Sequence, residues 1–374
     1  MTLAGRAILL LAAPVLTATH ALPAGKWKLT YFHDEDKSSL VLNGIAASSP
    51  QCAVAIGAIR SAGKAKPVAV VSADGGRSWT VHPLKSAPHS VQMLTSRLGF
   101  LAAEDGVWRT GDCGRTWERI SRLKGIVRVH FLDERQGFAA GAPKKALRTS
   151  DGGQSWRDLE IENAPQADPE RSVYANIAFT DDGFGMIGGW HKPRRPASPS
   201  GLPVWMDPES AGERRQWPSL TLMLQTLDFG KTWRGFSSSI LGQMTRIQLR
   251  GDVGLTLVEF EQSFDWPCEV YRIHIRGGES SRIFREKDRA ITDIALPPGG
   301  SALLAGFEPV GSLHQLPVPG KVRILGSEDL RTFHEFPVDY RAVARRVWLA
   351  APPSGPPLAA TDTGMILRLD EPAK

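Results

Sequence analysis

The stretch SADGGRSW, residues 72–79, has the composition of a tight polar turn that ends on a tryptophan. The chain repeats this pattern as TGDCGRTW (110–117), TSDGGQSW (149–156) and TLDFGKTW (226–233). A degenerate fifth copy, SEDLRTF (327–333), has lost the glycine and carries phenylalanine in place of tryptophan. A unit that recurs at a fixed spacing is typical of solenoids and propellers, so this repeat decides the fold.

Each copy of this box follows a short apolar strand and precedes another, as a hairpin turn does. Its aspartate can accept hydrogen bonds from backbone N–H groups inside the turn, and its glycine can adopt the positive φ that other residues resist. The tryptophan opens the next strand and turns back into apolar packing, where its truncation would cost about 3–5 kcal/mol. We therefore interpret the recurring aspartate and tryptophan of the four full boxes as structural residues: Asp74, Trp79, Asp112, Trp117, Asp151, Trp156, Asp228 and Trp233.

The spacing of the boxes is the second signal. The first three aspartates are 38 and 39 residues apart, which is the period of a propeller blade. Upstream of each box lie an apolar strand, a polar turn, a Gly-Phe pair and a second strand, so each unit has four antiparallel strands. The next interval is 77 residues but contains only one such pattern. We therefore predict that residues 191–218, rich in Pro, Ser and Arg, form a loop inserted within one blade.

The pattern as a whole predicts an all-β fold, a β-propeller of seven four-stranded blades, with six or eight as alternatives. Strand patterns continue after the fourth box, and residues 26–32 could complete the last blade. Strands from both chain ends would then close the ring and remove its free sheet edges. Residues 22–374 are accordingly treated as a single propeller domain.

The first 21 residues have the features of a secretory signal peptide. They contain one basic residue (Arg6), an apolar run over residues 7–18 and a small residue at Ala21. No later apolar stretch is long enough to span a membrane. We expect an exported protein, periplasmic or extracellular, that is monomeric.

Three cysteines, Cys52, Cys113 and Cys268, permit at most one intramolecular disulfide, and the sequence leaves open which two pair. Their spacing fits no metal motif, and we expect the fold to depend on its core, without metal or cofactor. The net charge of +6 and the pI of about 9.3 allow two interpretations: a mildly basic surface without consequence, or attraction to an acidic partner.

The form S/T-x-D-x-G-x-S/T-W of the boxes resembles the Asp-box, or BNR, repeat. With the Gly-Phe pairs, the size and the signal peptide, the chain is most similar to the photosystem II stability/assembly factor family of exported seven-bladed propellers, which has relatives in bacteria without photosynthesis. This resemblance implies a non-enzymatic binding or assembly scaffold whose partner is a protein, such as a subunit of a membrane complex, and not a nucleic acid.

Sialidases share the box and bind a carboxylate with three arginines, so a sialidase-like glycoside hydrolase or a propeller that binds a carboxylate sugar is the alternative. Aligning the innermost strands places five candidates for a channel ligand site at equivalent positions: Arg128, Asn176, Arg246, Asp293 and Arg346. Three arginines in one channel could bind a carboxylate bidentately. However, no tyrosine lies beside an acidic residue in a matched strand, and an arginine at a strand start is often only a solvated rim residue.

The inserted loop supplies the second set of candidates. Arginine and tryptophan are enriched at interface hot spots, and a long loop in a compact domain is usually either functional or disordered. The candidates for partner binding are Arg194, Arg195, Trp205, Arg214, Arg215 and Trp217. The alternative is a solvated loop without a binding role.

Overall fold

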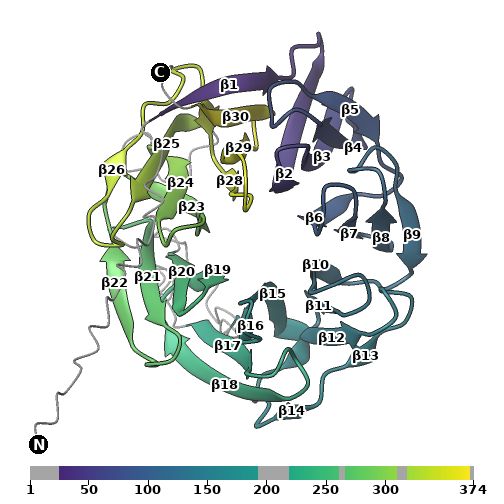
Figure 1. Cartoon of the computed structure of the whole chain (residues 1–374), viewed down its shortest axis with the longest axis vertical. Helices are drawn as coiled ribbons and strands as arrows, with labels where there is room; N and C mark the ends of the chain where they lie inside the picture. The colour runs from purple at the N-terminus through teal and green to yellow at the C-terminus, as the bar shows by residue number, and fades with distance from the viewer. Residues whose placement is uncertain (1–24, 193–218, 261–265, 310–317, 371–374) are drawn as a thin grey trace, which may run out of the picture.

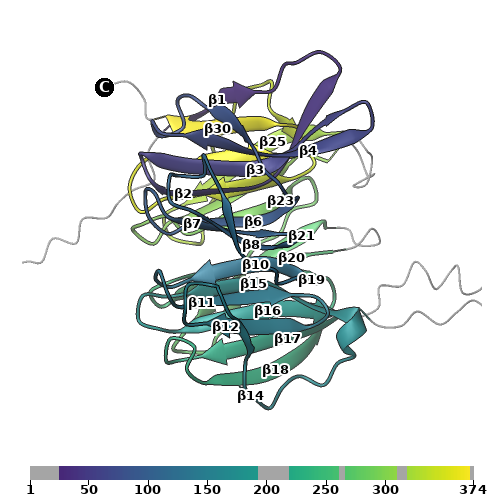
Figure 2. The same cartoon turned by 90° about the vertical axis from the view of Figure 1, so that its right-hand side faces the viewer.

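The computed structural model describes residues 25–192, 219–260, 266–309 and 318–370, and these form a ring of seven blades around a central channel (Figure 1). In blades 1 to 6 four antiparallel strands follow one another in sequence order from the channel to the rim, and in blade 7 the N-terminal strand supplies the rim strand. Figure 2 shows the ring from its side, where the strands run across its thickness. The predicted all-β propeller with seven blades is thus confirmed.

The strands of the first four blades follow the chain. Blade 1 contains β2 (Ser38–Ser49), β3 (Cys52–Ser61), β4 (Lys64–Ser72) and β5 (Thr80–Pro83). Blade 2 contains β6 (Pro88–Met93), β7 (Gly99–Ala103), β8 (Gly106–Thr110) and β9 (Glu118–Ser121). Blade 3 contains β10 (Ile126–Phe131), β11 (Gly137–Gly141), β12 (Lys145–Thr149) and β13 (Arg157–Asp158). Blade 4 contains β15 (Ser172–Phe179), β16 (Gly185–His191), β17 (Ser219–Thr226) and β18 (Trp233–Ile240), and a short strand, β14 (Ile161–Glu162), pairs in parallel with β18.

The other three blades complete the ring. Blade 5 contains β19 (Gln243–Arg250), β20 (Val253–Glu259), β21 (Cys268–His274) and β22 (Ser280–Phe284). Blade 6 contains β23 (Ala290–Ala295), β24 (Ala302–Phe307), β25 (Gly320–Ser327) and β26 (His334–Glu335), with β27 (Val343–Ala344) paired to β25. Blade 7 contains β28 (Val347–Ala350), β29 (Leu358–Thr361), β30 (Met365–Asp370) and β1 (Lys26–Phe32). A 3₁₀ turn, η1 (Pro169–Arg171), precedes β15.

The ring closes through the N-terminal strand, as the sequence predicted. β1 runs antiparallel to β30, with Lys26 opposite Asp370 and Phe32 opposite Met365. Trp27 of β1 is fully buried among the apolar side chains between blades 6 and 7. The first and last described strands therefore belong to one sheet, and β1 pairs the edge of β30 that would otherwise be open.

The boxes are hairpin turns between the third and fourth strands of their blades. In blade 1, the Ser72 hydroxyl donates to Asp74 Oδ1 (2.8 Å) and accepts the Gly76 N–H (2.9 Å). Asp74 Oδ1 also accepts the N–H groups of Arg77 (2.9 Å) and Ser78 (3.0 Å). The first residue of the box, whose role the sequence argument missed, thus helps the aspartate to hold the turn. The boxes of blades 2, 3 and 4 repeat the network with threonine in that first place.

The glycine and tryptophan of a box join its blade to the preceding one. Gly230 has φ of +77°, and a Cβ there would lie 2.1 Å from Phe138 of blade 3. The Trp233 ring packs edge-on against the same Phe138, with centroids 5.5 Å apart, and is 4% exposed. Only glycine allows this close approach, so the box of blade 4 is tied to blade 3 by packing.

One disulfide also joins two blades. Cys52 at the start of β3 bonds to Cys113 in the box of blade 2, 61 residues later, with Cα atoms 5.8 Å apart. Cys113 has φ of +62° and occupies the box position that is glycine in blades 1 and 3. The third cysteine, Cys268, is buried and free. The bridge adds a covalent link to a fold that we expected to depend on its core alone.

Two sets of predicted residues lie outside the described part of the chain. One is the signal peptide, residues 1–21. The other is the set of partner-binding candidates, because residues 193–218 between β16 and β17 are not described: Arg194, Arg195, Trp205, Arg214, Arg215 and Trp217. Within the described ranges, no helix is long and apolar enough to cross a membrane.

Candidate functional site in the central channel

The innermost strands share a bulge, which sets the position of most of the predicted channel residues. In each of blades 1 to 6 the register between the first and second strand shifts by one residue near the middle of the pairing or at its start. A bulge kinks its strand and re-aims the side chain that follows it. The residues directly after the six bulges are Gly44, Ser90, Arg128, Asn176, Arg246 and Asp293. The structure therefore brings four of the five predicted residues to equivalent backbone positions.

Polar side chains near these bulges link the inner strand of each of blades 1 to 6 to that of the next blade. Because the linked groups are buried or partly buried, each link satisfies polar atoms that water cannot fully reach. The links of blades 1 to 4 are Asn43 Nδ2 to Pro88 O (2.7 Å), Gln92 Nε2 to Phe131 O (3.0 Å), Arg128 Nε to Ala175 O (3.0 Å) and Asn176 Nδ2 to Met244 O (3.3 Å). Those of blades 5 and 6 are Arg246 Nε to Asp293 Oδ1 (3.0 Å) and Thr292 Oγ1 to Val347 O (3.0 Å). Sequence reasoning found three of these donors as ligand candidates and missed their shared structural role.

The link between Arg246 and Asp293 is an ion pair that is largely shielded from solvent. The side chains are only 16% and 8% exposed. Asp293 Oδ1 also accepts the Ile294 N–H (3.0 Å), and Oδ2 accepts the Leu349 N–H of blade 7 (2.9 Å). Asp293 thus joins three blades and neutralises the charge of Arg246.

Arg128 is the neighbouring cation and has no carboxylate in hydrogen-bond contact. Burial, and then the positive charge of Arg246, lowers its pKa to about 10, while Asp293 opposes this shift. Its Nε atom is used by the link to blade 4, but its terminal nitrogens have no hydrogen-bond partner among the described residues. A guanidinium with pKa of about 10 stays charged at neutral pH, so Arg128 carries an uncompensated positive charge.

His130, two residues further along β10, belongs to the same site and was missed by sequence reasoning. Burial, and then the charge of Arg128, lowers its pKa to about 4. Its ring stacks on that of Phe179 in blade 4, with centroids 5.4 Å apart. The imidazole is therefore neutral at pH 7 and offers a neutral hydrogen-bonding group beside the charge of Arg128.

The remaining predicted residue, Arg346, takes part in a separate ion pair. It directly precedes β28 and donates to both carboxylate oxygens of Glu259 at the end of β20 (3.1 Å each). The Arg346 side chain is 43% exposed. Glu259 was not foreseen, since 87 residues separate the two in sequence. The three arginines are thus in three different electrostatic states, and they do not form a uniform cluster of unpaired cations.

One tyrosine–acid contact lies away from the innermost strands, where the sequence analysis compared tyrosines with acids. The Tyr271 hydroxyl donates to Glu269 Oε2 (2.5 Å). Both residues lie on β21, the third strand of blade 5, and β20 separates that strand from Arg246 on β19. Burial, and then the hydrogen bond to Glu269, raises the pKa of Tyr271. The pair is therefore on a different strand from the channel arginines.

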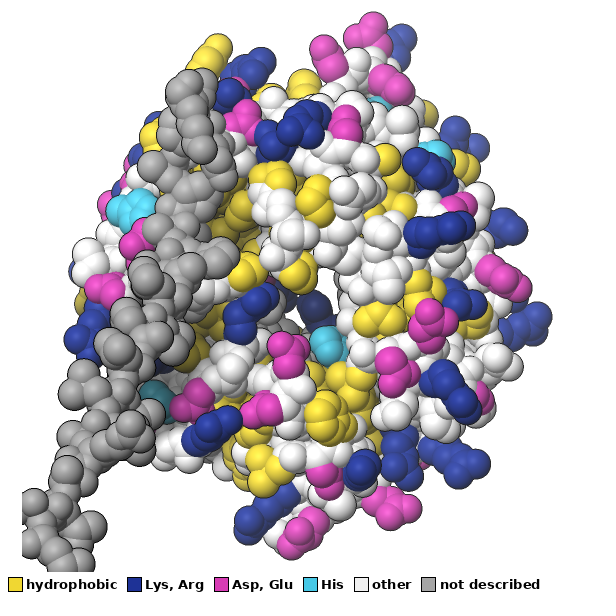
Figure 3. All heavy atoms as spheres, in the orientation of Figure 1, with side chains coloured by type: hydrophobic (Ala, Val, Ile, Leu, Met, Phe, Trp, Pro, Cys, Tyr) yellow, Lys and Arg dark blue, Asp and Glu magenta, His cyan; other side chains and the backbone are white. Residues whose placement is uncertain are grey.

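The space-filling view shows a hollow at the centre of the ring, with basic, acidic and histidine side chains at its edge (Figure 3). Of the charges described above, Arg246 is balanced by Asp293 and Arg346 by Glu259, which leaves the positive charge of Arg128. Such a site can attract one negatively charged group and donate hydrogen bonds to it.

No family model and no curated protein matches this sequence. Solved structures do match over most of the chain. YCF48 bound to D1 peptide is 15% identical over 93% of this chain and 97% of that one, with a TM-score of 0.59. YCF48 from Cyanidioschyzon merolae is 12% identical over 92% and 98%, with a TM-score of 0.57. The extracellular domain of a putative hybrid two component system from B. thetaiotaomicron is 9% identical over 92% of this chain and 39% of that one, with a TM-score of 0.58. These likenesses concern the fold: the chain is a β-propeller that resembles YCF48.

Proposed function

We propose that this protein is a non-enzymatic propeller that binds a protein partner and that an acidic group of the partner occupies the channel site. The observation that carries the proposal is the state of Arg128, whose terminal nitrogens and positive charge have no partner among the described residues. A partly desolvated guanidinium binds a carboxylate more strongly than one in bulk water does.

Two further considerations support a protein as the ligand. YCF48, whose fold this chain resembles, has been solved with a D1 peptide. A propeller presents loops of every blade around its channel, which suits a large or extended ligand. The signal-peptide pattern of residues 1–21 supports a role outside the cytoplasm, in the periplasm or beyond. The role would be that of a scaffold in the assembly of a complex, for example one in the membrane.

The test is binding of acidic peptides by the purified protein, measured by fluorescence anisotropy. The peptides are overlapping segments of envelope proteins from the producing organism, each compared with a version in which Asp and Glu are replaced by amides. We expect the acidic form to bind and the Arg128→Gln variant to bind it about tenfold more weakly or worse, since a hydrogen bond to a charged group contributes about 1.5–3 kcal/mol.

Gln92→Ala is the matched control. It removes the link between blades 2 and 3 without changing the charge of the channel. If the channel binds the acidic peptide through charge, Gln92→Ala keeps the wild-type affinity for it. A loss of affinity equal to that of Arg128→Gln would mean that the links between blades, and not the charge of Arg128, determine binding. Equal binding of acidic and amidated peptides would refute the proposal.

A carboxylate sugar is the alternative ligand, because the same positive charge would attract it. Titration with sialyllactose in the same assay separates the two ligands. Tight binding of the sugar without binding of any peptide would favour a carboxylate-sugar-binding propeller, and its turnover would favour a sialidase-like glycoside hydrolase.

The inserted loop remains a separate proposal for partner binding. Its arginines and tryptophans would add charge and aromatic anchors for the same partner. Replacing residues 193–218 with a short Gly-Ser linker should then weaken binding of the whole partner, while binding of a short acidic peptide at Arg128 is kept. Unchanged binding of the whole partner would exclude the loop.

A further inference from the structure

The fifth box differs from the other four in a way that opens a pocket between blades 5 and 6. Residues 327–333 form a turn of seven residues where the full boxes have eight, and the close-packing glycine is missing. Leu330, at φ of +58°, is buried against blade 5 and is only 3% exposed. Phe333 replaces the tryptophan and packs edge-on against Phe284 of β22. Because the glycine is missing, Arg331, which corresponds to Arg77 of the first box, follows Leu330 directly.

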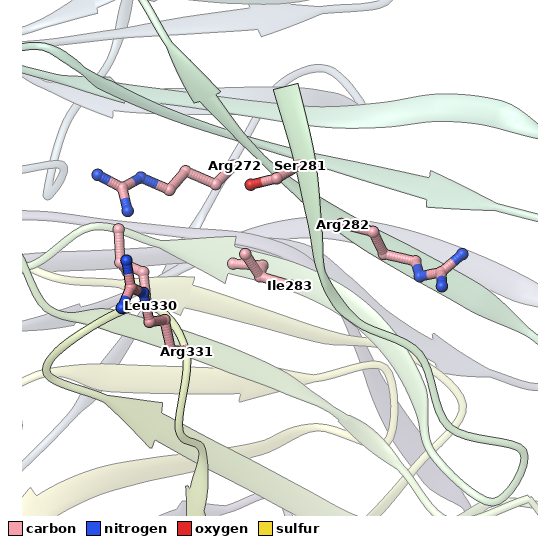
Figure 4. Close-up of a pocket in the computed structure, with 6 residues that line it drawn as sticks. All are labelled: Arg272, Ser281, Arg282, Ile283, Leu330 and Arg331. Carbon is pink, nitrogen blue, oxygen red and sulfur yellow. The ribbon is translucent and has the colours of Figure 1, made fainter. Parts of the chain in front are cut away.

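The pocket has a volume of about 310 Å³ and lies near the rim, between the outer strands of blade 5 and this turn (Figure 4). Its lining is mostly polar and cationic. It consists of Arg272, Ser281, Arg282, Ile283, Leu330 and Arg331. Arg272 and Ser281 are opposite each other on β21 and β22, so their side chains leave the sheet on the same face. The pocket is therefore separate from the channel site on the inner strands.

The two arginines at one side of the pocket lack carboxylate partners. Arg272 Nε is buried without a hydrogen bond, and no partner exists for the other side-chain nitrogens of Arg272 and Arg331 among the described residues. Figure 4 shows both guanidinium groups on the same side of the pocket, while that of Arg282 points the other way. Arg282 instead pairs with the buried carboxylate of Glu269.

Asp329, the aspartate of this turn, is bonded within the turn itself. Asp329 accepts the backbone N–H groups of Arg331 (2.8 Å) and Thr332 (2.7 Å), and its other oxygen accepts the Thr332 hydroxyl (3.2 Å). Its carboxylate is therefore used within its own turn, as in the other boxes. Two neighbouring guanidinium groups repel each other, and the buried Nε of Arg272 has no hydrogen bond. Both conditions are unfavourable unless an anion binds between the two groups.

We propose that this pocket binds a tetrahedral oxyanion of the phosphate or sulfate class. Two guanidinium groups can each donate a pair of hydrogen bonds to such an anion, and the Ser281 hydroxyl can donate one more. A phosphate group carries about 1.5–2 negative charges near neutral pH and so matches two cations better than a single carboxylate does. The anion is either free or the phosphate of a larger molecule, and both sources use the same contacts.

Isothermal titration calorimetry of the purified protein tests this proposal, with inorganic phosphate, sulfate and acetate as separate titrants at one ionic strength. We expect phosphate and sulfate to bind at one site and acetate to bind at least about tenfold more weakly. The Arg272→Gln and Arg331→Gln variants should each weaken phosphate binding by about tenfold or more, since each removes charge-assisted hydrogen bonds. Glucose 6-phosphate distinguishes the sources: tighter binding than phosphate indicates a larger ligand, and weaker binding a free anion.

Arg157→Gln is the control, because Arg157 is an exposed arginine on β13 of blade 3, far along the ring from the pocket. It should leave phosphate binding unchanged. Arg331 is exposed, so its replacement should not disturb folding even if that of the partly buried Arg272 does. No binding of phosphate to the wild-type protein, equal binding of acetate, or full phosphate binding in the folded Arg331→Gln variant would each overturn the proposal.

Discussion

Replacement of Asp151 by alanine tests whether the boxes are structural. Asp151 lies in the turn between β12 and β13 of blade 3. Its Oδ1 accepts the Thr149 hydroxyl (2.8 Å) and the N–H groups of Gln154 and Ser155 (3.0 Å each), and its Oδ2 accepts the Ser155 hydroxyl (2.5 Å). Alanine removes every one of these acceptors and leaves the backbone of the turn without its internal partner.

The expected loss of stability follows from the exposure of the donors. A hydrogen bond to a charged group contributes about 1.5–3 kcal/mol when its donor is left unpaired, but Gln154 and Ser155 are exposed and can bond to water instead. We therefore expect a total loss of about 1–3 kcal/mol in the free energy of unfolding. With an unfolding entropy of about 2.1 cal/mol/K per residue, each kcal/mol lowers the Tm of a chain of this size by about 1–2 °C.

Differential scanning calorimetry measures this change, with peptide binding as the second readout. Asp158→Ala is the matched control, since Asp158 is an exposed aspartate on β13 outside the turn. We expect a lower Tm for Asp151→Ala, no change for Asp158→Ala, and normal peptide binding by both at low temperature. An unchanged Tm together with lost binding would refute the structural interpretation of the boxes.

Cys52→Ser should lower the free energy of unfolding by about 4 kcal/mol, because the disulfide to Cys113 closes a loop of 61 residues. A thiol assay on the denatured, unreduced wild-type protein should find one free thiol. Three free thiols would contradict the disulfide. Hydrogen bonds to Asp228, first that from the Thr232 N–H, lower its pKa to about 2. Its folded pKa is below the unfolded value of about 3.9, so its contribution is complete above that value and is lost as the pH falls through about 2; acid titration of Asp228→Asn should lack this part of the wild-type profile. The purified protein should hydrolyse neither sialosides nor plant β-glucans, and turnover that disappears in Arg246→Ala would move the hydrolase alternative to first place.

Local patterns predicted the fold because they are repeated. The box signals a hairpin through residues that are close in sequence, and its spacing gives the blade. The pairing of residues 26–32 with the last blade could also be predicted, because an open sheet edge would expose unpaired backbone groups. The degenerate box of residues 327–333 was recognised on the same basis, although the pocket beside it was not.

Contacts between distant parts of the chain could not be predicted in this way. Glu259 and Arg346 are 87 residues apart, and Cys52 and Cys113 are 61 residues apart. Nothing in either local sequence marks the partner, because the two residues of each pair meet only when separate blades pack together. Four of the five inner-strand candidates do occupy equivalent positions, but the bond from Arg128 to the carbonyl of Ala175 could not be predicted, since a backbone acceptor is not visible in the sequence.

The bulge on the inner strands shows how such a ring can keep its geometry and vary its chemistry. The position after the bulge is Gly, Ser, Arg, Asn, Arg and Asp in blades 1 to 6. The backbone conformation is set by strand pairing and by the boxes near the rim, so this position can change without loss of the blade. All of its charged residues lie in blades 3, 5 and 6, which makes the channel electrostatically asymmetric although the fold is nearly symmetric. A charged ligand in this channel would therefore favour one orientation. Its negative group is expected at Arg128, the cation that has no carboxylate partner.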